Sequence, residues 1–125
     1  MAKTERLHDA SLDVYTAAEV KQMLDANEIV LIDVRTPAEF MFEHVPGALL
    51  YPMSGFDAAK LPTQEGKRIV FHCGSGLRSR RIAERCHAAG VAPLAHMEGG
   101  FAAWKQAGFK YYAIDPATGS VTLRP

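Results

Sequence analysis

The 125-residue chain is predicted to fold as an α/β protein with a parallel sheet, and three observations support this class. Short apolar runs, typical of strands buried on both faces, recur along the chain. Segments with helical periodicity alternate with these runs, which is the pattern of βα units. Glycine and proline turns separate the two kinds of segment. The length fits a single domain that can bury its core without disulfides or metals.

Five strands are expected, one for each apolar run. The run Ile29-Val30-Leu31-Ile32 is continuously apolar, as expected of a strand that helices cover on both faces. The expected strands are residues 12–15, 29–32, 48–51, 68–72 and 94–97.

The helices between these strands carry start and stop signals. Thr16 and Thr36 each stand three residues before a glutamate, which is the capping-box pattern, and Pro37 occupies the first position of the second helix. Two later apolar stripes end at Gly90 and Gly108, as helices that terminate at glycine do. Helices are therefore expected after the first, second, fourth and fifth strands.

Two segments fit the βα pattern less well. Residues 54–66 are weakly patterned, and only a short helix between loops is expected there. We expect one domain over residues 1–125, with a core at about 12–108 and a C-terminal extension at 109–125. Within the extension, the expected elements are a packing segment at 111–114, a turn at 115–119 and an edge strand at 120–123.

The charge balance excludes several classes of function. Fourteen basic and fourteen acidic residues cancel, which argues against generic binding to nucleic acids or to membrane surfaces. The N-terminal residues lead into no apolar segment of the signal-peptide type, and no apolar run approaches membrane-spanning length. A cytoplasmic location is therefore expected.

The two cysteines, Cys73 and Cys86, are not expected to pair. If a helix begins near Leu77, Cys86 lies about 13 Å along it. Disulfide partners need Cα atoms within about 7 Å of each other. Two cysteines at this spacing also form no zinc site.

Cys73 is the candidate nucleophile. It follows a buried strand and opens the segment CGSGLRS, after which helical periodicity begins. Backbone N–H groups freed by glycine, a helix N-terminus and the guanidinium of Arg78 would all stabilise a thiolate and hold an anion beside it. The alternative is a buried strand-end cysteine, and the glycine spacing and Arg78 argue against it.

Four stretches resemble, in order, the motifs of rhodanese-type sulfurtransferases. The loop has cysteine and arginine separated by four residues. Residues 31–40 (LIDVRTPAEF) resemble the first signature of that family, residues 44–48 (HVPGA) its His-Ile-Pro-Gly-Ala segment, and residues 99–104 (GGFAAW) its closing Gly-Gly-x-x-x-Trp. The resemblance covers about residues 14–108.

This resemblance implies a five-stranded parallel sheet flanked by helices on both faces. It also implies that the Cys73 thiolate takes a sulfane sulfur from a small anionic donor such as thiosulfate, becomes a persulfide, and passes the sulfur to a thiol, to cyanide or to an acceptor protein. Arg78 would help to bind the donor, and the reaction would need no metal or organic cofactor. The residues expected to hold the substrate are Gly74, Ser75, Gly76, Leu77 and Arg78.

Asp33 and Arg35 are expected to support the site. They follow the second expected strand, and a structural ion-pair network is favoured over direct contact with substrate. Ser79 is interpreted as a helix-start residue. His72 should point to the opposite face of the sheet from its neighbour Cys73, so no role as a base is assigned to it. Cys86 is assigned to the core.

Two other functions stay open. Phosphatases of the same fold carry five residues between cysteine and arginine, so a phosphatase or arsenate reductase is the less favoured enzyme. A non-catalytic interaction or sulfur-sensing module is the other, although such modules often lack the cysteine. The chain also departs from the family pattern at Glu43, usually glycine, and at apolar Leu77, which leaves thiosulfate, a protein persulfide and mercaptopyruvate as candidate donors.

Overall fold

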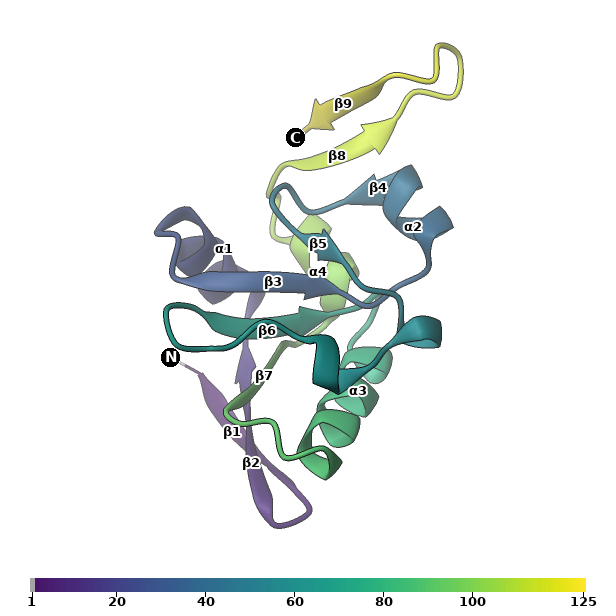
Figure 1. The fold of residues 1–125 in the computed structure, drawn as a ribbon. Coiled ribbons are helices and arrows are strands. Elements are labelled where there is room, and N and C mark those ends of the chain that lie inside the picture. Colours follow the sequence, from purple (N-terminus) through teal and green to yellow (C-terminus); the bar gives the residue numbers. More distant parts are fainter. Residues whose placement is uncertain (1) are drawn as a thin grey trace.

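The computed structural model describes residues 2–125 and shows an α/β fold with a central mixed sheet (Figure 1). Six strands form this sheet in the order β1-β2-β7-β6-β3-β5. Neighbours pair in parallel from β2 to β5, while β1 pairs antiparallel with β2. The strands are β1 (Lys3–Leu7), β2 (Ala10–Tyr15), β3 (Ile29–Asp33), β5 (Leu49–Leu50), β6 (Arg68–His72) and β7 (Leu94–Met97).

The five parallel strands are those that the sequence predicts, and β1 is an addition to the prediction. Its residues, KTERL, are exposed except for Leu7, because β1 is an edge strand with little apolar contact. An edge strand of this kind carries no alternating apolar pattern, so periodicity does not reveal it. The third predicted strand is shorter than expected, with only Leu49 and Leu50 in register beside β3.

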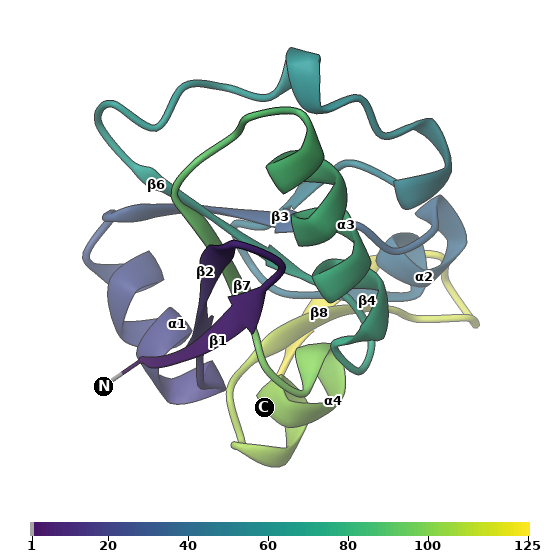
Figure 2. The same cartoon turned by 90° about the horizontal axis from the view of Figure 1, so that it is seen from below.

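Helices cover both faces of the sheet, as Figure 2 shows. On one face α1 (Ala17–Asp25) and α4 (Gly100–Gln106) bury Val20, Phe101 and Trp104 against the strands. On the other face α3 (Leu77–Ala88) buries Ile82 and Cys86. Both capping boxes form as predicted, at Thr16 for α1 and at Thr36 for α2 (Pro37–Phe42).

Residues 53–60 form two short 3₁₀ turns, Met53–Gly55 and Ala58–Lys60, in place of the single short helix expected there. Phe56, between them, is buried and packs on the same face as α3. Met53, Ala58 and Leu61 pack beside it while only partly buried, and their spacing across two short turns and loops follows neither helical nor strand periodicity.

The C-terminal extension is a hairpin that projects from the body (Figure 1). Strands β8 (Tyr111–Ile114) and β9 (Val121–Arg124) pair antiparallel, and β8 also pairs with β4 (Glu43–His44). The predicted packing segment, turn and edge strand are all present, with the last strand displaced by one residue.

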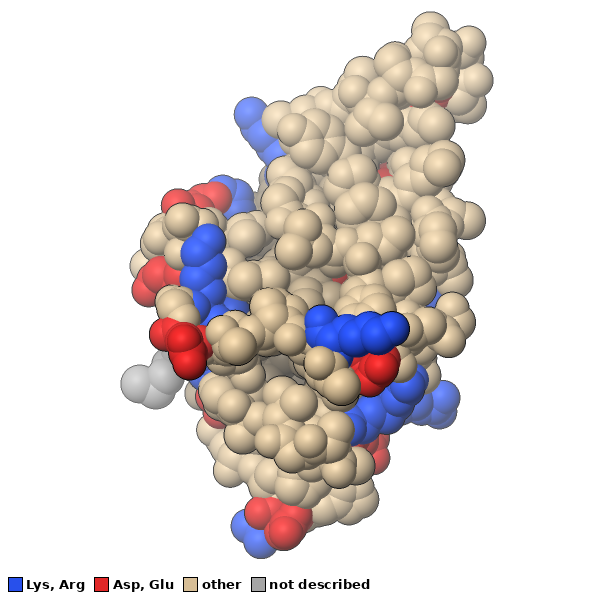
Figure 3. Space-filling view, viewed as in Figure 1, with Lys and Arg blue, Asp and Glu red and all other residues tan. Residues whose placement is uncertain are grey.

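The described surface mixes charges of both signs. On the face shown in Figure 3, acidic and basic side chains lie close together in small groups. Within residues 2–125, no helix is long and apolar enough to cross a membrane. The same residues contain no group of three or more His, Cys, Asp or Glu side chains arranged to hold a metal ion.

Candidate active site

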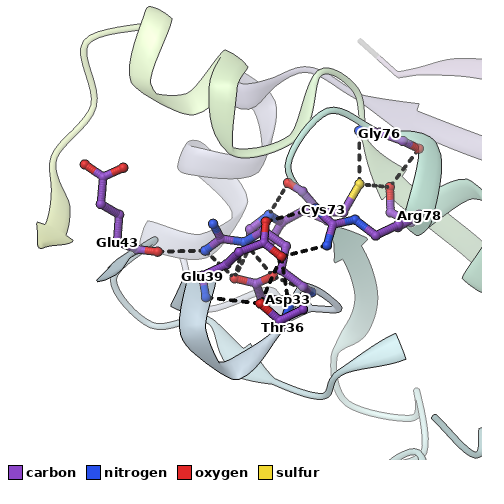
Figure 4. A network of polar contacts seen from close by, with 10 residues as sticks. Asp33, Thr36, Glu39, Glu43, Cys73, Gly76 and Arg78 are labelled. Atoms are coloured by element: carbon purple, nitrogen blue, oxygen red, sulfur yellow. Dashed lines mark hydrogen bonds and ion pairs between the residues drawn. The ribbon is translucent and has the colours of Figure 1, made fainter. Parts of the chain in front are cut away.

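The Cys73 loop connects β6 to α3 at the carboxyl end of the parallel sheet, where sites of this fold class gather. Gly76 is the N-cap of α3 with φ of +114°, and its N–H donates to Cys73 Sγ at 3.0 Å (Figure 4). Ser79 Oγ lies 3.7 Å from the same sulfur. The Cys73 residue has 0% of its surface exposed, so the sulfur is enclosed by its own loop.

The first turn of α4 is hydrogen-bonded to the backbone of the Cys73 loop. The N–H of Phe101 donates to the Cys73 carbonyl at 2.8 Å, and the N–H of Ala102 donates to the Gly74 carbonyl at 3.1 Å. Gly100 makes this approach possible, because a Cβ there would lie 2.3 Å from the Cys73 carbonyl oxygen. Its φ of +57° also suits glycine. Gly100 therefore lets the backbone of α4 and the backbone of the Cys73 loop come into contact.

The substitution Gly100→Ala is expected to destabilise the protein by at least about 2 kcal/mol, because left-handed backbone and a clash with the loop act together. Unfolding by urea measures the loss. Gly55→Ala is the matched control, since nothing lies within 4 Å of the added methyl group. A Gly100→Ala protein as stable as this control would contradict the close approach.

The thiol pKa values of the two cysteines shift in opposite directions, although both residues are buried. Burial opposes ionisation of Cys73, but hydrogen bonds from the backbone and hydroxyl of Ser79 and from the backbone of Gly76 and Ser75 outweigh it. The pKa of the Cys73 thiol is therefore lowered. Cys86 has no comparable donors, and burial raises the pKa of its thiol to about 11. The loop thus selects Cys73 as the thiol that ionises.

Arg78 is held by a carboxylate that sequence analysis did not assign to the site. Its guanidinium donates to both carboxylate oxygens of Glu39, at 2.7 and 3.0 Å, in a bidentate ion pair (Figure 4). Glu39 also belongs to the capping box at Thr36. This local role accounts for the glutamate in the sequence, so the sequence does not point to a second partner 39 residues away. The hydrogen bond from Arg78 lowers the pKa of Glu39 to about 2. The loop is thereby tied to the start of α2.

Acid should break the ion pair between Glu39 and Arg78. Glu39 has a lower pKa folded than unfolded, so its pairing stabilises the protein above the ordinary carboxyl range and is lost as pH falls toward 2. We expect Glu39→Gln to flatten the dependence of the unfolding free energy on pH between about 4.5 and 2. Denaturant titrations over this range measure it. Exposed Glu65→Gln is the control, and an equal flattening there would contradict the assignment.

Asp33, the last residue of β3, and Arg35 form a buried ion pair. Arg35 donates to the two Asp33 carboxylate oxygens at 2.8 to 3.0 Å and to the Glu43 carbonyl at 2.7 Å. Its guanidinium also lies over the Phe101 ring, 4.7 Å from the centroid. His72 Nε2 is 3.5 Å from Asp33. These contacts join β3, β4, β6 and α4 around the site.

Besides Glu39, sequence analysis did not assign Ser79 and His96 to the site. Ser79 lies inside α3 and is not its cap, since Gly76 occupies that position. Helical side chains lean toward the N-terminus, which brings Ser79 Oγ back to Cys73. His96, on β7, places Nδ1 2.8 Å from the same hydroxyl. A serine two residues after the start of the helix could have indicated a side chain near Cys73. A single histidine on a strand gives no such indication in the sequence.

Residues 16–107 match the family model described as the rhodanese-like domain. The chain belongs to the rhodanese-like family. It is 40% identical over 89 residues to an uncharacterized protein of Synechocystis, covering 71% of this chain and 50% of that protein. It is 28% identical to a sulfurtransferase of Allochromatium vinosum, covering 74% and 87%.

The solved structure of a rhodanese-like domain protein from Staphylococcus aureus has a TM-score of 0.62 at 29% identity, covering 73% of this chain and 89% of its own. A protein of unknown function from Rhodopseudomonas palustris, described as a possible tyrosine phosphatase, has a TM-score of 0.64 at 29% identity, covering 76% of this chain and 80% of its own. The chain spans about half the length of the Synechocystis relative and about a quarter of the next curated ones. Among its relatives, this rhodanese-like chain therefore has named sulfurtransferases and one described as a possible phosphatase.

The predicted substrate-binding residues occupy different places in this rhodanese-like site. The N–H groups of Ser75 and Gly76 favour the Cys73 thiolate. Leu77 leaves 71% of its surface exposed beside the loop. The Arg78 side chain is turned to Glu39. The backbone supplies most of the donors that surround the sulfur, and the charged side chain stands at the rim.

Proposed function

We propose that this rhodanese-like chain is a sulfurtransferase that carries sulfane sulfur as a persulfide on Cys73. The observation that supports the proposal best is the lowered pKa of the Cys73 thiol inside a loop of converging donors. A thiolate is the reactive form of cysteine, and the other described thiol is made inert by its environment. Membership of a family with sulfurtransferase relatives supports the same reaction.

The first half-reaction needs only the donor. The Cys73 thiolate attacks the outer sulfur of thiosulfate, a new S–S bond forms, and the sulfur–sulfur bond of thiosulfate breaks. Sulfite leaves with the electron pair of that bond. The backbone N–H groups of Ser75, Gly76 and Ser79, which favour the Cys73 thiolate, and the start of α3 would stabilise the negative charge of the terminal sulfur.

The second half-reaction regenerates the thiolate. A nucleophilic acceptor, such as cyanide or a thiol, attacks the terminal sulfur, and Cys73 leaves with the electrons of the S–S bond. The protein performs nucleophilic covalent catalysis, with no net change in its own oxidation state. Thiosulfate is the proposed first probe, with protein persulfides and mercaptopyruvate as further donors.

Donor binding must change the loop. Cys73 is enclosed, so a sulfane sulfur reaches Sγ only when the residues around it separate. Arg78 can meet an anion at the rim if its guanidinium shares or leaves Glu39. The proposed route is therefore capture of the anion by Arg78, followed by entry of its outer sulfur between Leu77 and Cys73.

Whole-protein mass spectrometry tests the proposal. The purified chain is incubated with thiosulfate, a small persulfide and mercaptopyruvate in turn. We expect a gain of one sulfur atom with at least one donor, and its removal by cyanide with release of thiocyanate. No gain with any donor would refute the proposal. Hydrolysis of p-nitrophenyl phosphate without sulfur uptake would favour the phosphatase, and binding of a partner without either activity would favour an interaction module.

A further inference from the structure

A buried chain of polar atoms leads from the Cys73 sulfur to a histidine. Ser79 Oγ is 3.7 Å from Cys73 Sγ and 2.8 Å from His96 Nδ1. Ser79 has 0% of its surface exposed and His96 has 5%. The sulfur comes from the loop after β6, the hydroxyl from α3 and the imidazole from β7, so the fold brings these three side chains together at one place.

The hydroxyl at the centre of this chain has one hydrogen and several neighbours. When Cys73 is a thiol, its S–H donates to Ser79 Oγ, and the Ser79 hydroxyl can donate to His96 Nδ1 or to the Gly76 carbonyl at 3.2 Å. When Cys73 is a thiolate, the same hydroxyl must turn and donate to sulfur. His96 Nδ1 must then carry a hydrogen in order to stay bonded to Ser79.

We propose that His96 is a positioning residue that accepts, through Ser79, the proton of the Cys73 thiol. The inference deepens the proposed sulfur transfer and rests on it. The S–H proton moves to Ser79 Oγ while the Ser79 hydroxyl proton moves to His96 Nδ1. The products are a thiolate and an imidazolium, so the total charge is unchanged. No external base is consumed, and the reverse transfer restores the thiol.

The surroundings of His96 act on its charge in both directions. Burial lowers the pKa of His96, so its imidazole is neutral near neutral pH, as a proton acceptor must be, and the same burial opposes the imidazolium that the transfer forms. Glu5 on β1 and Glu98 after β7 favour the imidazolium, while Arg80 on α3 opposes it. Glu5 is itself paired with Arg80, and Glu98 with Lys3, which moderates all three influences.

The neighbouring His72 is not an equivalent base. Its Nδ1 is 3.1 Å from the Cys73 carbonyl oxygen and its Nε2 faces Asp33 at 3.5 Å. The first contact ties the ring to the backbone, whereas Nε2 is buried beside the carboxylate without a hydrogen bond to it. His96 is therefore the histidine connected to the sulfur through a side-chain hydroxyl.

The rate of Cys73 alkylation by iodoacetamide as a function of pH tests the relay, with the modified residue identified by mass spectrometry. Wild type should show two rises, one as the Cys73–His96 pair loses its first proton and one as the second leaves. His96→Gln keeps a hydrogen-bonding side chain but takes no proton, so it should show only the upper rise. Near neutral pH its rate should fall about tenfold or more, the change expected for one unit of thiol pKa.

Two further variants separate a relay from a structural role. Ser79→Ala breaks the connection without changing His96 and should also lose the lower rise, while Ser79→Thr keeps the hydroxyl and should restore it. His87→Gln, at a partly exposed histidine paired with Asp9, should leave the profile unchanged. Circular dichroism checks that each variant is folded.

The outcomes decide the relay independently of sulfur transfer. A His96→Gln profile that superposes on wild type overturns the relay, as does an equal shift in His87→Gln. If wild type gains sulfur while the profiles superpose, the proposed function stands and the relay fails. If wild type gains no sulfur from any donor, the proposed function fails, and the alkylation profiles still report whether His96 takes the thiol proton.

Discussion

Cys73→Ala is expected to reduce sulfur transfer from thiosulfate to cyanide by at least about 10⁴-fold, because no other described thiol can take its place. Thiocyanate release measures the turnover, and mass spectrometry should show no sulfur gained by the variant. Cys73→Ser is a second test with nearly the same shape. Its hydroxyl can keep the contacts with Gly76 and Ser79 but is not ionised near neutral pH.

Cys86→Ala is the matched control for the nucleophile. Cys86 lies on the core-facing side of α3 and the pKa of its thiol is raised, so its loss should cost about 1 kcal/mol of stability and leave transfer intact. Turnover by Cys73→Ala at the wild-type rate would refute the persulfide on this residue. Equal losses in both cysteine variants would show that the effect comes from packing and not from chemistry.

The parallel strands and capped helices could be predicted because their signals are local. The run Ile29–Ile32 predicts a doubly covered strand without reference to any partner, and the threonine caps specify where α1 and α2 begin. The edge strand β1 could not be predicted, because its pairing with β2 is carried by backbone hydrogen bonds that polar residues make equally well. Its antiparallel pairing makes the sheet mixed.

The candidate site also has features that the sequence predicts and features that it does not. The position of Cys73 after a buried strand and its glycines are visible in the sequence, and the loop geometry adds how they act: Gly76 donates to the sulfur while Gly100 admits α4 beneath it. The partners of the loop are not visible. Glu39 lies far from Arg78 in sequence, and His96 is connected to Cys73 only through Ser79. Contacts of this kind depend on tertiary packing, which a single sequence does not record.

Asp33→Ala should cause the largest loss of stability of any substitution considered, about 3–5 kcal/mol, because it leaves Arg35 buried without its carboxylate. Asp33→Asn should lose less, since its amide oxygen can still accept the backbone N–H of Arg35 that Asp33 accepts at 3.0 Å. The loss is a large share of the roughly 5–15 kcal/mol that stabilises a typical domain.

Urea unfolding measures this loss, and the exposed pair Lys21–Asp25 supplies the control. Asp25→Ala removes a carboxylate from a solvated helix surface and should cost less than about 1 kcal/mol. A loss for Asp33→Ala no larger than this control would contradict the buried network. Since Arg35 also binds the Glu43 carbonyl and covers the Phe101 ring, an unpaired Arg35 disturbs both β4 and the start of α4. The backbone of α4 supports the Cys73 loop, so Asp33→Ala should also slow persulfide formation in the protein that remains folded.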